Sequence, residues 1–176
     1  MILDQIAADT RLRVEAKKKE ISLEEVKRDA QSMEKNTGFP FETALRKSDL
    51  SFICEVKKAS PSKGIIAEEF PYLQIAKEYD EAGADAISCL TEPKYFLGKD
   101  EYLKAIAKEV KIPVLRKDFV VDEYQIYEAK ILGASAVLLI CAILEEEQLK
   151  VYLQIAKELG LSALVVAHDE MEIKQA

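Results

Sequence analysis

The sequence is poor in the residues that mark metal-binding and disulfide-stabilised proteins. It contains one histidine, His168, and no Cys-x-x-Cys pair among its three cysteines. A zinc site is therefore not expected. The cysteines are Cys54, Cys89 and Cys141. Each lies in an apolar run, so we expect small buried thiols in a reducing compartment.

Long apolar runs and an excess of positive charge are also missing. No run reaches the roughly 18 residues of a membrane-spanning helix, and the first twenty residues lack the apolar core of a signal peptide. The formal net charge of −7 disfavours general nucleic-acid binding, because the phosphate backbone attracts basic proteins. We therefore predict a cytoplasmic protein that binds neither nucleic acid nor a membrane.

The composition that remains is that of a folded domain, with 49% hydrophobic and 32% charged residues. The N-terminal part indicates helices. The first, over residues 3–19, is expected to be fairly exposed. A second begins at Ser22, where Ser22 and Glu25 form a capping box. We expect one domain over residues 1–176, with residues 1–50 as a helical extension within it.

From Phe52 onward, apolar runs alternate with amphipathic helices. The runs lie at 52–56, 86–90, 114–117, 136–140 and 163–167, and the helices near 70–82, 100–109, 122–132 and 145–159. Runs that are apolar throughout indicate strands buried on both faces, and intervening helices indicate parallel crossovers. Gly83 and Gly133 join a helix to the next strand, as helix C-caps do. A heptapeptide at 72–78 recurs at 152–158, which supports repeated βα units.

Five βα units fit either an open doubly wound sheet or part of a barrel. No G-x-G-x-x-G follows the first run, which disfavours a dinucleotide-binding sheet. A (β/α)8 barrel typically needs about 250 residues, and this chain supplies about 70% of that length. We therefore predict an α/β fold of the (β/α)8 TIM-barrel family that is incomplete.

Charged residues gather at the predicted carboxyl ends of the strands, where α/β folds place their sites. Glu55 and Lys57 share one face of the first strand. From spacing alone, a structural ion pair explains them as well as a catalytic pair does. Lys117 ends the third strand and shares a face with Leu115. It either pairs with Glu55 or Asp118, or acts as a general acid, Schiff-base amine or anion clamp. Lysines at two strand ends favour function.

Two loops add further candidates. The loop after the first strand offers the Ser60 hydroxyl, the Lys63 cation and a flexible backbone. Such a loop suits the binding of an anion or a phosphate. Tyr95 and Phe96 follow the second strand, where they either wall an aromatic pocket or cover the core. His168 follows the fifth strand and is assigned no role.

These segments, taken in order, resemble the indole-3-glycerol phosphate synthase family. Residues 55–64 read Glu-Val-Lys-Lys-Ala-Ser-Pro-Ser-Lys-Gly, residues 90–98 read Leu-Thr-Glu-Pro-Lys-Tyr-Phe-Leu-Gly, and residues 115–119 read Leu-Arg-Lys-Asp-Phe. Leu-Leu-Ile at 138–140 fits the fourth strand, and the resemblance covers the whole chain, including the N-terminal helices.

The resemblance implies a carboxy-lyase of tryptophan biosynthesis. The family converts 1-(2-carboxyphenylamino)-1-deoxyribulose 5-phosphate, a phosphorylated anthranilate derivative, into indole-3-glycerol phosphate, carbon dioxide and water, without metal or organic cofactor. It also implies residue roles: Lys117 as general acid, Lys57 as carboxylate ligand and second acid, Glu55 as the acid that orients both lysines, Ser60 as a substrate contact, and Phe96, Phe119 and Leu138 as walls of the anthranilate pocket.

One position departs from the family pattern. The fifth strand of the family usually reads Leu-Val-Glu-x-His, whereas residues 164–168 read Leu-Val-Val-Ala-His. Val166 therefore stands where the family has a glutamate that serves as general base. Valine cannot transfer a proton, and the loss of an acid–base group typically costs about 10²–10⁴-fold in rate.

The second departure is length. The chain stops at Ala176, and the sixth to eighth strands of the family, with their phosphate loops, are missing, so we expect a truncated barrel with two open sheet edges. Such a chain is expected to self-associate or to pair with a C-terminal barrel fragment. The alternative to an enzyme is thus an impaired or inactive fragment that assembles through those edges. A third hypothesis is another sugar-phosphate barrel enzyme that uses Lys117 as a Schiff base.

Overall fold

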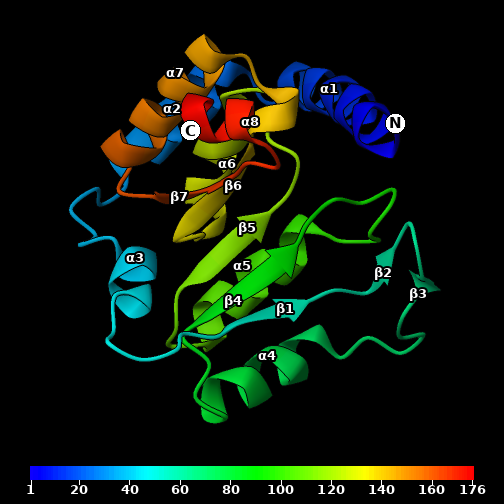
Figure 1. The fold of residues 1–176 in the computed structure, drawn as a ribbon, viewed down its shortest axis with the longest axis vertical. Helices are drawn as coiled ribbons and strands as arrows, with labels where there is room; N and C mark the ends of the chain where they lie inside the picture. The colour runs from blue at the N-terminus through cyan, green and yellow to red at the C-terminus, as the bar shows by residue number, and fades with distance from the viewer.

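Five parallel strands form the centre of the computed structural model, which describes residues 1–176 (Figure 1). They are β1 (Ile53–Val56), β4 (Ala86–Leu90), β5 (Val114–Lys117), β6 (Ala136–Ile140) and β7 (Ser162–Val166). Each strand pairs with the one before it in the chain, so the order β1-β4-β5-β6-β7 never reverses. A doubly wound sheet reverses at a switch point. The predicted partial TIM barrel is therefore confirmed.

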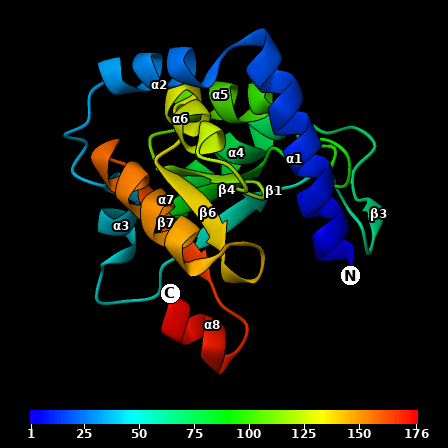
Figure 2. The same ribbon diagram turned by 90° about the horizontal axis from the view of Figure 1, so that it is seen from above.

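Four helices cover the outer face of this sheet (Figures 1 and 2). They are α4 (Tyr72–Glu81), α5 (Asp100–Glu109), α6 (Tyr124–Leu132) and α7 (Glu146–Glu158), each within two residues of its predicted bounds. Gly83 and Gly133 follow α4 and α6 with φ of 86° and 90°. A residue with a side chain is strained there, so the predicted glycine caps are confirmed.

The N-terminal helices close the two ends of the sheet. Helix α1 (Ile2–Glu20) runs beside the carboxyl ends of the strands, followed by α2 (Leu23–Ser32) (Figure 2). Helix α3 (Pro40–Leu45) closes the amino ends, where Phe41 packs with Ala86, Leu115 and Ala136. The capping box at Ser22 is present as predicted. The expectation of a largely exposed α1 is only partly right, because one side of it is buried: Ile6, Ala7, Thr10 and Val14.

Three short elements do not appear in the sequence pattern. Strands β2 (Ala59–Ser60) and β3 (Gly64–Ile65) form an antiparallel hairpin directly after β1. A 3₁₀ turn, η1 (Cys141–Ile143), follows β6. Each of these three is too short for a hydrophobic period to be detected in the sequence. Helix α8 (Glu170–Gln175) follows β7, where the sequence indicates the start of a further helix.

The main core lies between the sheet and its helices, and the two outer strands are left with a free edge. Buried side chains of α5, α6, β6 and α7 pack together there. Strands β1 and β7 are each paired on one side only. Next to the β1 edge, the Phe52 side chain is 59% exposed. No helix combines the length and apolar character needed to cross a bilayer.

Candidate active site

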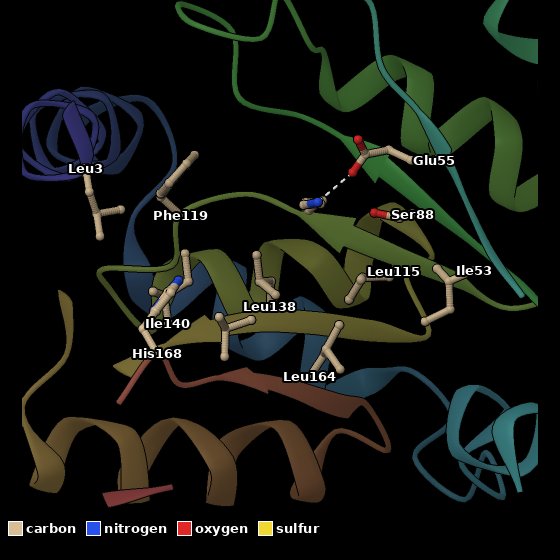
Figure 3. Close-up of a pocket in the computed structure, with 12 residues that line it drawn as sticks. Leu3, Ile53, Glu55, Ser88, Leu115, Phe119, Leu138, Ile140, Leu164 and His168 are labelled. Atoms are coloured by element: carbon tan, nitrogen blue, oxygen red, sulfur yellow. Dashed lines mark hydrogen bonds and ion pairs between the residues drawn. The ribbon is translucent and has the colours of Figure 1, made fainter. Parts of the chain in front are cut away.

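A pocket of about 530 Å³ opens on the concave face of the sheet, towards the carboxyl ends of the strands (Figure 3). All five strands contribute to its wall, and Leu3 of α1 adds to its rim (Figure 3). The lining residues are Leu3, Ile53, Glu55, Ser88, Leu115, Lys117, Phe119, Leu138, Ile140, Leu164, Val166 and His168. An apolar pocket with a few convergent polar groups is the usual form of a small-molecule site.

One carboxylate binds two lysines at the mouth of this pocket. Lys57 Nζ donates to Glu55 Oε1 and Lys117 Nζ donates to Glu55 Oε2, both at 2.5 Å. Glu55 lies on β1 and Lys57 directly follows the strand, and the two point to the same side because side chains alternate along an extended backbone. Lys117 reaches them from β5, with only β4 between. The predicted convergence of the two amines is therefore confirmed.

Glu55, Lys57 and Lys117 form a triad in which each charged group stabilises the charge of its neighbour. Burial alone would raise the pKa of the Glu55 carboxyl, but the hydrogen bonds and charges of Lys117 and Lys57 outweigh burial and lower that pKa below its usual value. Glu55 is therefore ionised at neutral pH. Two ammonium groups and one carboxylate leave a net positive charge at the mouth, which suits an anionic ligand.

Ion pairs on the outer side of β5 fix the end of the strand that carries Lys117. Arg116 is 1% exposed and donates to Asp100 and Glu128 at 2.8 and 2.6 Å. Asp118, also 1% exposed, accepts two hydrogen bonds from Arg13 of α1 at 2.8 and 3.1 Å. Lys117 therefore points into the pocket, whereas ion pairs hold the side chains of Arg116 and Asp118 on the opposite face of the sheet.

An aromatic pair lies at the pocket, with Phe119 in the lining and Phe96 packed behind it. The rings of Phe96 and Phe119 lie 6.0 Å apart between centroids, at 36°. The loop that carries Phe96 is organised by the buried Glu92, whose carboxylate accepts hydrogen bonds from the backbone N–H groups of Lys94, Tyr95 and Phe96. Three charge-assisted bonds to one acid define the loop conformation.

The sequence-predicted residues divide into two groups. Glu55, Lys117, Phe119 and Leu138 line the pocket. Lys57 and Phe96 do not line it, but they contact Glu55 and Phe119, which do. Ser60 lies outside: it belongs to the β2–β3 hairpin, where its nearest side-chain partner is Ser62 at 3.5 Å between Oγ atoms.

The pocket also contains residues that sequence reasoning missed. Ser88 and Ile53 lie on strands among apolar neighbours, and only strand alternation counted from Leu90 and Glu55 could have indicated that they face inward. His168 lines the pocket too. Its side chain is 63% exposed, and its Nδ1 lies 3.3 Å from Glu172 Oε2.

Comparison with known proteins identifies the family of the chain. A family model described as indole-3-glycerol phosphate synthase matches residues 3–176. The chain belongs to the indole-3-glycerol phosphate synthase family. Over its whole length it is 60% identical to the indole-3-glycerol phosphate synthase of Ruminiclostridium cellulolyticum and 54% identical to that of Endomicrobium trichonymphae, and it covers 68% of each. The protein of that name from Lachnoclostridium phytofermentans is 50% identical, with 69% covered.

Val166 occupies the position at which the resemblance to the indole-3-glycerol phosphate synthase family predicts a glutamate, and it lies in the pocket. Its side chain lines the wall formed by β7, in register with Ile140 of β6. A glutamate side chain at this position would enter the same pocket as Glu55 and Lys117. Here that wall is apolar: Leu164 and Val166 line it, and Leu138 and Ile140 of β6 lie beside them.

Proposed function

We propose that this chain carries the indole-forming site of an indole-3-glycerol phosphate synthase and acts on 1-(2-carboxyphenylamino)-1-deoxyribulose 5-phosphate. The observation that carries the proposal is the Glu55 carboxylate shared by Lys57 and Lys117 at 2.5 Å. The ligand has a carboxylate, a ketone and a phosphate, and each needs a cation or a proton donor. Membership of the family supplies the reaction, and the triad supplies groups able to perform it.

In the proposed reaction, the ring carbon that bears the carboxylate attacks the ketone carbon. The ketone oxygen takes a proton from the Lys117 ammonium as the new bond forms. Carbon dioxide then leaves and the ring regains aromaticity. In the last step the new hydroxyl departs as water, which requires an acid on the oxygen and a base on the neighbouring carbon. The atoms balance as one indole-3-glycerol phosphate, one carbon dioxide and one water.

We assign the remaining roles on the same basis. Lys57 binds the substrate carboxylate and shares in the acid chemistry, and Glu55 orients both ammonium groups through its two hydrogen bonds. Phe119 and Leu138 contact the anthranilate ring from the pocket wall, and Phe96 supports Phe119. Ser60 contacts the substrate only if the β2–β3 hairpin bends towards the pocket when the ligand binds.

Turnover of the substrate tests the proposal directly. The chain has no tryptophan, so the fluorescence of the indole product rises against a tyrosine background alone. We expect Lys117→Met to lower kcat by about 10²–10⁴-fold, because it removes the general acid. Lys77→Met is the matched control, since Lys77 forms only an exposed pair with Glu109. Equal rates for Lys117→Met and the parent chain would contradict the assignment.

The assay also tests the alternative hypothesis of an inactive fragment, for which Val166 is the motivating residue. In that case the parent chain gives no indole but still binds the substrate with its ketone reduced to an alcohol.

We further propose that the free edges of β1 and β7 are covered by a second copy or by a C-terminal barrel fragment. The one-sided pairing of both strands supports this. The cytoplasmic location remains a prediction from the sequence.

A further inference from the structure

One buried hydroxyl in the pocket has no hydrogen-bond partner. Three buried hydroxyls in the chain lack a partner, those of Thr10, Ser88 and Ser162. Of these, only Ser88 lines the pocket. Ser88 is 4% exposed. An unsatisfied buried hydroxyl is unfavourable, because it gives up hydrogen bonds to water and gains none. Ser88 therefore has unused hydrogen-bonding capacity facing a ligand site.

Strand register places this hydroxyl beside the triad. Ser88 of β4 is the register partner of Glu55 on β1 and of Leu115 on β5, and all three line the pocket. Lys117 stands two residues beyond Leu115, on the same face. Figure 3 shows Ser88 close to Glu55, the residue that accepts the hydrogen bond from Lys117. Both oxygens of Glu55 already accept from lysines, so the Ser88 hydroxyl is free to meet a ligand.

We infer that Ser88 is a further substrate-binding residue, whose hydroxyl donates a hydrogen bond to the ligand oxygen that the Lys117 ammonium also reaches. This inference rests on the proposed function, because it takes the ligand to be the phosphorylated anthranilate sugar with its ketone at Lys117. The hydroxyl is uncharged, so it holds this oxygen without competing for the proton that Lys117 supplies. It thereby fixes the direction from which the ketone meets the acid.

The competing explanation is a core serine that fills space, and Ser162 is the matched example. Ser162 is 2% exposed, unpartnered and on the same face of β7 as Leu164 and Val166. It lies at the amino end of that strand, in register with Ala136, and does not line the pocket. Replacing either serine by alanine makes the same chemical change in a similar environment. Only Ser88 is placed to affect a ligand.

The experiment measures the affinity of the substrate whose ketone is reduced to an alcohol, an analogue that keeps the oxygen but cannot react. Binding is followed by fluorescence of its aminobenzoate ring, which the tryptophan-free chain leaves unobscured. We expect Ser88→Ala to raise Kd by about 2- to 10-fold, the effect of one lost hydrogen bond. Ser162→Ala leaves Kd unchanged. The thermal unfolding midpoint of ligand-free Ser88→Ala stays the same or rises, because an unsatisfied hydroxyl is removed.

Three outcomes overturn the inference. An unchanged Kd for Ser88→Ala, with weaker binding by Lys117→Met, removes the role of Ser88 and leaves the proposed function intact. Equal losses for Ser88→Ala and Ser162→Ala assign the effect to the core rather than to the ligand. Absence of binding by the parent chain removes the proposed function, and this inference with it.

Discussion

Val166 decides how much of the acid–base chemistry the pocket can perform. The triad supplies acids, but the dehydration step also needs a base. Glu55 is already bonded to two lysines. The β7 wall offers only apolar side chains at the height of Val166, and the nearby His168 has a largely exposed side chain. A site with this residue is expected to bind better than it turns over.

We therefore expect Val166→Glu to raise the rate of indole formation by at least about tenfold in a barrel completed with the remaining strands of a relative, because a positioned base contributes about 10²–10⁴-fold. Single-turnover fluorescence measures the chemical step. Val166→Gln is the control, since it has the same size but transfers no proton. A rate for Val166→Glu no higher than that for Val166→Gln would show that this position is not the base.

The cysteines give a second prediction for individual residues. Burial raises the pKa of the Cys89 thiol to about 12, and burial also raises that of Cys141. The thiolate is the reactive form, so both thiols are expected to resist alkylation at neutral pH. Cys54 is half-buried and should react first. Mass spectrometry after iodoacetamide should find one modification in the folded chain and three in denaturant. Rapid labelling of Cys89 under native conditions would contradict the packing of β4.

Among the elements, α1 binds residues that follow both β4 and β5. Asp9, Arg13 and Lys17 recur at four-residue spacing and so form one stripe of the helix. Asp9 binds Lys94 and Tyr95 of the β4–α5 loop, at 2.7 and 2.6 Å. Arg13 binds Asp118 and Lys17 binds Asp100 and Glu128. One helix thereby holds the ends of both β4 and β5.

We expect Arg13→Met to lower the free energy of unfolding by about 3–5 kcal/mol, since it leaves the fully buried Asp118 carboxylate without its bidentate partner. Chemical denaturation measures the change. Arg46→Met is the control: Arg46 is 79% exposed and pairs with Glu42 on the surface, so its loss should cost about 1 kcal/mol or less. Equal effects of the two substitutions would mean that the Arg13–Asp118 pair contributes no more than a surface pair.

The sequence predicts the helices, strands and caps that depend on residues close together in the chain. The strand β4 and the helix α5 have the bounds expected from periodicity alone, and the Ser22 cap follows from two residues three apart. The partners of the buried Arg116 and Asp118 were not predictable in this way. Arg13, for example, lies 105 residues from Asp118 in the chain. No local pattern reports which distant charge will be nearby.

The same division holds for the candidate site. The meeting of Lys57 and Lys117 at Glu55 could be predicted, because parallel strands bring their carboxyl ends to one edge. The hairpin that takes Ser60 away from the pocket could not, since each of its strands has only two residues. Ser88 was missed because a serine within an apolar run looks like part of the core.

At the scale of the whole molecule, the two free sheet edges are the feature that we expect to govern association. Strands β1 and β7 would be interior strands in a closed barrel, and here each has unpaired backbone groups along one side. The grouping of residues 1–176 into a single domain remains a prediction. The relatives are longer than this chain, which covers 68% of each of the two most identical ones described above.

We expect the isolated chain to self-associate in a concentration-dependent way, with sedimentation showing species of at least twice the monomer mass. Phe52→Asp should shift the equilibrium towards monomer, because it places a charge beside the exposed β1 edge. Leu12→Asp is the control: Leu12 is 71% exposed but lies on α1, away from both edges. Adding a separately produced C-terminal part of a relative should likewise disperse the oligomers. A monomer at all concentrations would contradict the prediction.

The unreversed strand order also bears on how the polypeptide matures during synthesis. Every strand after the first pairs with the one made just before it, so the sheet can grow at a single edge as the chain leaves the ribosome. Helix α1 is made first, yet Arg13 finds its partner only 105 residues later. The earliest helix thus cannot make this contact before β5 has emerged, and until then the carboxyl end of the growing sheet is uncovered.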